Sequence, residues 1–242
     1  MIEVISLEDS TLKSSINEQL KGADFVYLDA ISDSGIIESS FDQYLATLIY
    51  GRTLRPAEMG CSLSHRTAIK NFLKTNGDWR VILEDDAIVT SGFLCFVEGL
   101  SEYELSLPIM LVLGHSKTVQ KNLWWQKIKQ PFYEVIELNS LRFGTLPYTN
   151  FVGTVGYALN KNAAFIINNM PKTFWIADDW RIFENAGIKV YHAATPLVFE
   201  NLNSSSSTAN IVKPLHSLFS RGFFGELWIA YRALMRRYIF KS

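Results

Sequence analysis

Glu84, Asp85 and Asp86 are three consecutive acidic residues that directly follow an apolar run. Like charges this close repel and raise each other's pKa values unless a cation lies among them. Carboxylate oxygens are the ligands that Mn²⁺ and Mg²⁺ prefer, commonly together with the phosphates of a substrate. The triplet therefore predicts a site for one of these ions. The alternative is an acidic loop in which Asp85 or Asp86 caps the next helix.

The residues before the triplet indicate where it lies. Val81–Leu83 is apolar at consecutive positions, as in a parallel strand that is buried on both faces. Ligands of open α/β sheets bind beyond the carboxyl ends of such strands. Because side chains alternate along an extended chain, Glu84 and Asp86 are expected on one side and Asp85 on the other. Glu84 and Asp86 are therefore the predicted metal pair.

Strands and helices alternate along the rest of the chain, which favours an α/β fold. Short apolar runs predict strands at Ile2–Leu7, Phe25–Leu28, Arg80–Leu83, Ile109–Leu113, Val152–Leu159 and Ile188–Tyr191. Helical spacing and end signals predict helices at Ala57–Leu73, Asn160–Asn169 and Asp178–Ala186. A polar, serine-rich linker is expected over Asn203–Asn210.

Composition limits the class of protein. The chain has 242 residues, of which 48% are hydrophobic and 19% charged, as in a folded globular protein. It has no apolar run of membrane-spanning length and no secretory signal, so we expect a cytoplasmic protein. Cys61 and Cys95 lack a metal-binding or disulfide spacing, so we expect ordinary reduced cysteines and no zinc site.

Charge divides the chain into a main domain, residues 1–212, and a basic tail, residues 213–242. The net charge is −1, but the tail carries six Lys or Arg against one acid, which leaves the main domain acidic and argues against nucleic-acid binding. The tail has apolar residues at helical spacing and predicts an amphipathic helix on an anionic membrane surface. Packing on the domain and a homodimer contact are the alternatives.

Several segments together resemble glycosyltransferase family 25, the lipooligosaccharide sugar transferases. They are VISLEDS (Val4–Ser10), GCSLSH (Gly60–His65), VILEDDAIV (Val81–Val89), GTVGYALNKNAA (Gly153–Ala164) and DDW (Asp178–Trp180). The resemblance covers roughly residues 1–210 and excludes the tail. It implies a GT-A type, Rossmann-like nucleotide-sugar-binding domain with a central mixed, mostly parallel sheet.

The resemblance also implies an activity. In the family, a DXD-like acidic motif holds Mn²⁺ or Mg²⁺ on a UDP-sugar donor, and transfer inverts the configuration at the sugar. Bacterial members commonly move galactose from UDP-galactose onto a saccharide of the lipooligosaccharide or LPS core, often in a β-1,4 linkage. We therefore expect a lipid-linked acceptor and peripheral attachment to the inner face of the bacterial inner membrane.

The resemblance suggests roles for residues outside the triplet. Inversion needs a base for the acceptor hydroxyl, and Asp178 or Asp179 is the candidate; helix capping by one of them, with Trp180 in the core rather than stacked on a sugar, is the alternative. Ser6, Ser64 and His65 are expected at the donor site, although a buried structural histidine is the other interpretation of His65.

Four further residues are weaker candidates. Arg52 and Arg55 are expected to contact the diphosphate, against the alternative of solvated surface arginines. His192 or His115 could join the metal site, but ordinary buried or surface histidines are the more common outcome.

Two other functions compete with sugar transfer. A nucleotidyl or phosphoryl transferase would use similar metal carboxylates, although the sequence lacks a glycine-rich phosphate loop. A glycan-binding or assembly protein with impaired catalysis is the other, favoured slightly by Ser14 and Ser15, which replace a basic pair of the family.

Overall fold

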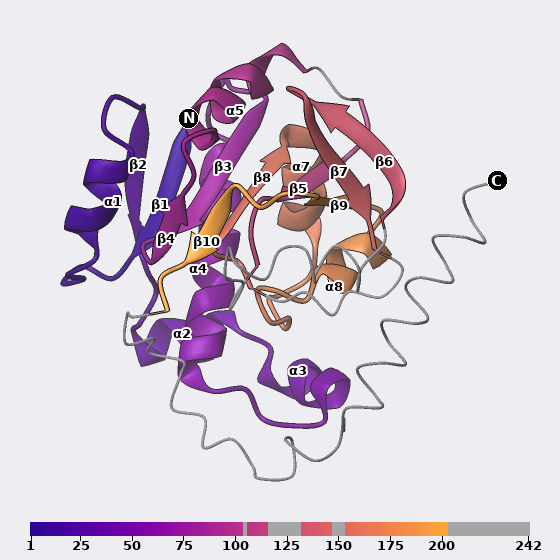
Figure 1. The fold of residues 1–242 in the computed structure, drawn as a ribbon. Helices are drawn as coiled ribbons and strands as arrows, with labels where there is room; N and C mark the ends of the chain where they lie inside the picture. Colours follow the sequence, from indigo (N-terminus) through magenta and orange to yellow (C-terminus); the bar gives the residue numbers. More distant parts are fainter. Residues whose placement is uncertain (104–105, 116–131, 147–152, 203–242) are drawn as a thin grey trace, which may run out of the picture.

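The structure is a computed structural model that describes residues 1–103, 106–115, 132–146 and 153–202 (Figure 1). These residues form one large sheet with helices on both faces, so the predicted α/β, Rossmann-like class is confirmed. The predicted linker and the basic tail lie outside the described residues. In the described part of the chain, no helix combines the length and the apolar character needed to cross a membrane.

Eight of the described strands form the main sheet, in the order β2-β1-β3-β8-β5-β9-β7-β6, and two short strands form a separate ladder. The strands are β1 (Ile2–Ser6), β2 (Phe25–Asp29), β3 (Trp79–Glu84), β4 (Ala87–Val89), β5 (Ile109–Val112), β6 (Tyr133–Leu138), β7 (Leu141–Thr145), β8 (Gly156–Asn160), β9 (Lys189–Ala193) and β10 (Val198–Glu200). All six predicted strands are present, and the predicted strand from Val152 begins later, at Gly156.

The sheet is mixed, as expected, but its pairings are not mostly parallel. Three neighbouring pairs are parallel and four are antiparallel. Only β8 and β7 run against the other six strands, and each of them creates two antiparallel pairings because each lies inside the sheet. The ends of β1, β3, β5 and β9 therefore meet the beginning of β8 at one edge of the sheet.

Helices cover both faces of the sheet and one end. They are α1 (Lys13–Gln19), α2 (Ser34–Ser40), α3 (Gln43–Tyr50), α4 (Pro56–Phe72), α5 (Phe93–Gly99), α7 (Lys161–Asn169) and α8 (Trp180–Asn185), with a short 3₁₀ turn at Leu100–Glu102. Apolar residues of α1 and α5 pack on one face, and those of α4, α7 and α8 pack on the other. Helices α2 and α3 form a small third cluster with α4, beyond the carboxyl ends of β1 and β3 (Figure 1).

Helix α4 carries the GCSLSH segment, and its start follows from local chemistry. Pro56 occupies the first turn, where its missing N–H costs nothing. Glu58 accepts a hydrogen bond from the Arg55 backbone N–H at 2.8 Å, which satisfies the chain just before the helix. At Gly60, a β-carbon would collide with the Ile31 carbonyl oxygen, so glycine allows α4 to pack closely on the segment after β2.

The segment around β10 crosses the carboxyl edge of the sheet. The Leu197 N–H donates to the Leu113 carbonyl oxygen at 2.8 Å, and the Asn201 N–H donates to that of Asp86 at 2.8 Å. Between these contacts, β10 pairs antiparallel with β4. The residues after β3 and β5 are thus tied together at one edge.

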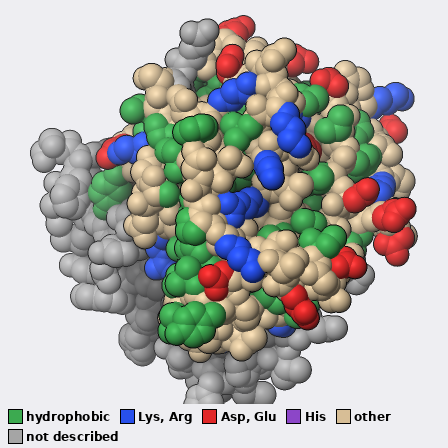
Figure 2. Space-filling model, turned by 180° about the vertical axis from the view of Figure 1, so that it is seen from behind, with side chains coloured by type: hydrophobic (Ala, Val, Ile, Leu, Met, Phe, Trp, Pro, Cys, Tyr) green, Lys and Arg blue, Asp and Glu red, His purple; other side chains and the backbone are tan. Residues whose placement is uncertain are grey.

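The face of the molecule behind the sheet carries charges of both signs. Figure 2 shows lysine and arginine side chains toward its middle, interspersed with apolar surface, and acidic side chains nearer its rim.

Candidate functional site

Residues from five segments converge at the carboxyl edge of the sheet. The acidic triplet follows β3, Ser6 ends β1, and the Thr154 side chain reaches Glu84 from just before β8. His65 approaches from α4. Asp178 lies before α8 and is close enough for the Glu84 charge to affect its pKa. The predicted position of the triplet, at the end of a buried strand, is confirmed.

The carboxylate of Glu84 is held in place by two side chains from other segments. His65 Nε2 lies 3.2 Å from Glu84 Oε1, and the Thr154 hydroxyl donates to the same oxygen. The other ring nitrogen of His65, Nδ1, lies 3.1 Å from the Tyr157 hydroxyl. Burial raises the pKa of Glu84, but the hydrogen bond and charge of His65, with the Thr154 hydroxyl, outweigh it, so the net pKa is lowered. These contacts hold the carboxylate ionised and in place.

The pKa of Asp86 is shifted in the opposite direction from that of Glu84. Among the described residues, its Oδ1 atom is buried without a hydrogen-bond partner. Burial, followed by the charges of Glu84, Glu200 and Asp85, raises the pKa of Asp86 to about 8. An acid that is buried among other acids lacks a positive neighbour, and a divalent cation supplies that charge. The residues present therefore fit a hard cation.

The side chain of Asp85 is held by a residue of β1. The Ser6 hydroxyl donates to Asp85 Oδ2 at 2.6 Å. On β1 and β3, the residues two positions before Ser6 and Asp85 pack against α1 and α5. Glu84 instead faces α4, from which His65 reaches it. The charge of Glu84 reaches Asp86 and helps to raise its pKa, and Ser6 holds Asp85. Among the described residues, the three acids do not form a group with ligand atoms within 4.8 Å of one another, so the Glu84–Asp86 metal pair stays a prediction.

Asp178 and Asp179 have different surroundings. Asp178 Oδ2 accepts the Gly153 N–H at 2.8 Å, and burial raises the pKa of Asp178, with the charge of Glu84 adding to the effect. Asp179 instead accepts the Tyr50 hydroxyl at 3.0 Å and lies 3.4 Å from Arg181 Nε. Asp179 is the residue before α8, but its side chain accepts no capping hydrogen bond. Only Asp178 is linked to the acidic cluster.

Trp180 packs in the core and is not available to stack on a sugar. Its side chain is 1% exposed and meets the rings of Tyr157 and Phe183. The core alternative for this residue is the one that the structure shows.

Ser64 and the two arginines make contacts within the protein. The Ser64 hydroxyl accepts the Ile31 N–H at 2.8 Å and donates to the Gly60 carbonyl, so it fastens α4 to the segment after β2. Arg52 forms two hydrogen bonds with Glu58, at 2.7 and 2.9 Å, and Arg55 lies 3.5 Å from the same carboxylate. The contacts of Arg52 and Arg55 with Glu58 fix the start of α4, and contact of these arginines with a diphosphate stays a prediction.

His115 and His192 lie together in the interior. Their rings stack with centroids 5.2 Å apart, and both side chains are buried. Burial lowers the pKa of His115 to about 3, and burial followed by the charge of His115 lowers that of His192. Neither residue belongs to the group of possible metal ligands around Glu84 among the described residues.

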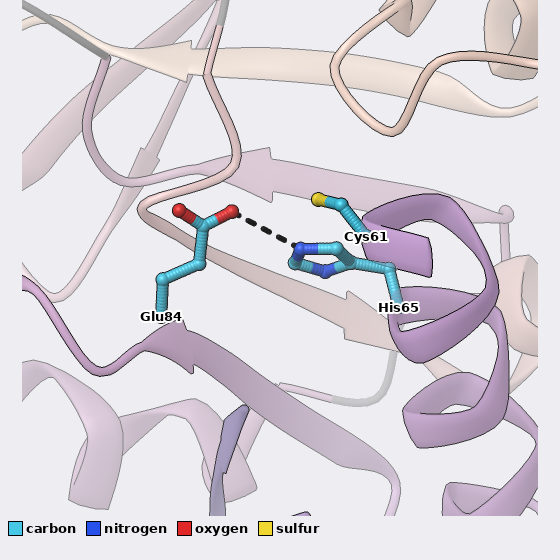
Figure 3. Close-up of side chains that lie close together, drawn as sticks. All are labelled: Cys61, His65 and Glu84. Carbon is cyan, nitrogen blue, oxygen red and sulfur yellow. Dashed lines mark hydrogen bonds and ion pairs between the residues drawn. The ribbon is translucent and has the colours of Figure 1, made fainter. Parts of the chain in front are cut away.

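Sequence reasoning missed three residues of the site, namely Cys61, Thr154 and Tyr157. Cys61 precedes His65 by one helical turn, and the two side chains lie side by side near Glu84 (Figure 3). Thr154 and Tyr157 reach the site because β8 runs antiparallel to β3. The spacing of Cys61 and His65 was the available signal, since i and i+4 share one helix face.

The geometry can be compared with known proteins. Residues 1–181 match glycosyltransferase family 25, described as LPS biosynthesis protein. The chain belongs to glycosyltransferase family 25. The match spans the whole acidic cluster, from Ser6 to Asp178, so this family 25 protein is a glycosyltransferase whose candidate site lies inside the shared region.

Three solved structures are distantly similar to this family 25 chain. A protein from STIV has a TM-score of 0.38 and 12% identity, over 81% of this chain and 82% of that one. A glycosyltransferase involved in glycosylation of the major capsid of PBCV-1 has a TM-score of 0.38 and 14% identity, over 97% and 98%. The inositol-1-phosphate CTP transferase from T. maritima has a TM-score of 0.38 and 13% identity, over 84% and 91%. A comparison with curated proteins gives no match.

Proposed function

We propose that this glycosyltransferase is an inverting, metal-dependent hexosyltransferase that moves galactose from UDP-galactose onto a lipooligosaccharide, LPS or related glycan. One observation carries the proposal: carboxylates of Glu84, Asp86 and Asp178 gather at the carboxyl edge of the sheet, and Asp86 Oδ1 is buried there with no hydrogen-bond partner in the described part of the chain. Ligands of open α/β sheets bind at this edge. Galactose and the β-1,4 linkage follow from the family resemblance.

Glu84 and Asp86 would hold Mn²⁺ or Mg²⁺, with Asp85 completing the acidic turn. The ion, when bound, supplies positive charge that stabilises the departing diphosphate. The protein fixes the positions of two carboxylates: His65 and Thr154 hold Glu84, and Ser6 holds Asp85. Carboxylates fixed in this way need little rearrangement when donor and metal arrive.

Asp178 is the better candidate for the base. Inversion by a single displacement requires a group that accepts the proton of the attacking hydroxyl. Burial raises the pKa of Asp178, which makes its carboxylate a stronger base than a solvated one. The hydrogen bond from the Gly153 N–H fixes Asp178 Oδ2 in place. Asp179 is already engaged by Tyr50.

A donor screen tests the proposal. The purified protein is incubated with UDP-galactose, UDP-glucose or UDP-N-acetylglucosamine, with Mn²⁺, Mg²⁺ or chelator, and with saccharide acceptors. We expect transfer from UDP-galactose that needs the metal and falls about 100-fold or more in Asp86→Asn, since such variants remove charge stabilisation of the transition state. UDP binding without turnover would favour a glycan-binding protein instead, and transfer unaffected by chelator would exclude the metal role.

We extend the proposal to the membrane through the basic tail. The tail carries Arg232, Arg236 and Arg237, and each cation near anionic lipid contributes about 1 kcal/mol of binding. We expect the protein to float with anionic liposomes. A variant with these three arginines changed to glutamate should remain in the fraction without liposomes. Equal flotation of the two proteins would exclude a role of these arginines in membrane binding.

A further inference from the structure

Among the described residues, one group of three side chains has ligand atoms close enough together to hold a metal ion, and it includes Glu84. The ligand atoms of Cys61, His65 and Glu84 all lie within 4.8 Å of one another. Cys61 and His65 project from consecutive turns of α4 and face Glu84 at the end of β3 (Figure 3). From the sequence we expect an ordinary reduced cysteine and no zinc site, and this arrangement gives a reason to propose otherwise.

The ligand types select a different ion from the one expected at Asp86. A thiolate, an imidazole and a carboxylate form a mixed set that suits Zn²⁺, whereas Mg²⁺ and Mn²⁺ prefer oxygen ligands. Three protein ligands leave the fourth tetrahedral position open to water or a substrate atom.

The distance between His65 and Glu84 agrees with tetrahedral geometry. Two ligands bound to zinc at about 2.0 Å each lie roughly 3.3 Å apart. His65 Nε2 and Glu84 Oε1 are 3.2 Å apart. The separations that involve Cys61 Sγ are at most 4.8 Å, whereas a sulfur and a nitrogen or oxygen bound to one zinc lie about 3.5 Å apart, so these separations shorten by at most about 1.3 Å on binding.

Neighbouring residues hold the ligands in position. The Tyr157 hydroxyl contacts His65 Nδ1, which is the outer-shell contact that orients a metal-binding histidine. The Ser64 hydroxyl joins α4 to the Ile31 backbone, and Gly60 packs closely against the same residue. The backbone on both sides of Cys61 is therefore fixed before any ion binds.

We propose that Cys61, His65 and Glu84 form a zinc site that shares Glu84 with the donor-metal site and blocks transfer when it is occupied. The blocking role rests on the proposed function, whereas zinc binding does not. On binding, the Cys61 thiol releases its proton to solvent and the sulfur bonds to zinc, with no change of oxidation state. Because Glu84 is then bound to zinc, the donor metal loses one of its ligands and transfer stops.

Cobalt absorption tests the site without any measurement of activity. Co²⁺ replaces zinc at mixed sites, and a thiolate bound to it gives an intense near-ultraviolet charge-transfer band that oxygen ligands do not give. We expect this band in the full-length protein and its loss when Zn²⁺ is added. It should be absent in Cys61→Ser and retained in Cys95→Ser, in which the exposed cysteine of α5 is changed.

Zinc affinity and inhibition complete the experiment. Loss of an outer-shell partner alone weakens metal binding by about 10- to 100-fold, so Cys61→Ser should weaken zinc binding by at least about 100-fold in a chelator competition. Cys61→Ala serves as a second variant, and circular dichroism reports the folding of both. No charge-transfer band in the wild-type protein, or a band that persists in both Cys61 variants, would overturn the site. Zinc binding without inhibition would overturn only the blocking role.

Discussion

At Glu84, two side chains from distant parts of the chain support one carboxylate. His65 arrives from α4 and Thr154 from the segment before β8, and both contact Oε1. Because Glu84 lies among other acids, removal of either donor leaves a carboxylate that is poorly stabilised.

Two substitutions of Thr154 separate the role of its hydroxyl from the role of its side-chain volume. Thr154→Val keeps the shape and removes the donor, so we expect a loss of about 1 to 2 kcal/mol in the free energy of unfolding and a fall in transfer rate of about tenfold. Thr154→Ser keeps the donor and should stay close to wild type. Urea denaturation and initial rates measure the two effects; equal behaviour of the valine and serine variants would contradict a role for the hydroxyl.

Asp178 and Asp179 are neighbours with different predicted roles. Asp178→Asn should lower kcat by about 100-fold or more while UDP still binds, because it removes the proposed base. Asp179→Asn weakens the contact with Tyr50, so it should lower stability more than kcat. Kinetics with calorimetric UDP binding distinguish these outcomes. A larger kcat effect at Asp179 would reverse the assignment.

At the scale of elements, the start of α4 depends on Glu58. This carboxylate pairs with Arg52 and Arg55 and also accepts the Arg55 backbone N–H. The hydrogen bond from Arg52 lowers the pKa of Glu58 to about 2, although burial opposes the shift. A lowered pKa means that the folded state favours the ionised form. Its contribution to stability is therefore complete above the ordinary value of 4.5 and is lost as the pH falls toward 2.

Glu58→Gln tests this element through its pH dependence. The glutamine keeps an oxygen for the backbone N–H, so mainly the charge is lost. Since both arginines are nearly half exposed, we expect a loss of only about 1 to 2 kcal/mol at neutral pH and little difference near pH 2. Urea denaturation at several pH values measures the difference. Glu38→Gln on exposed α2 is the control, and a constant difference at all pH values would contradict the ion-pair explanation.

At the scale of the whole molecule, the candidate site depends on a close crossing of chain segments. The Val198 backbone passes against Gly114 so closely that a β-carbon on Gly114 would collide with it. The same segment continues to Asn201, which hydrogen-bonds the Asp86 backbone. A change at Gly114 is therefore expected to reach the acidic turn, although Gly114 follows a different strand.

Gly114→Ala should lower the free energy of unfolding by about 1 to 3 kcal/mol, the usual cost of an overpacked interior, and should raise the KM for the donor. Gly92→Ala is the matched control, because a β-carbon at Gly92 meets no atom within 4 Å. Thermal denaturation and kinetics measure both variants. Similar stability of the two would show that the crossing at Gly114 is looser than described.

The sequence by itself determined the local features of this protein. The apolar run before Glu84 placed the triplet correctly at the end of a buried strand, because this signal depends on neighbouring residues alone. The motifs around His65 and Asp178 identified the family. The antiparallel direction of β8 was not predicted, since an apolar run carries no information on strand direction.

Only the tertiary structure decided which side chains share the site. Thr154 lies 70 residues from Glu84 in sequence and contacts it because β8 reverses beside β3. Cys61 joins His65 and Glu84 because α4 packs across the end of that strand. Residue spacing reports contacts within one turn or one strand, whereas contacts between elements depend on the register and packing of the whole sheet.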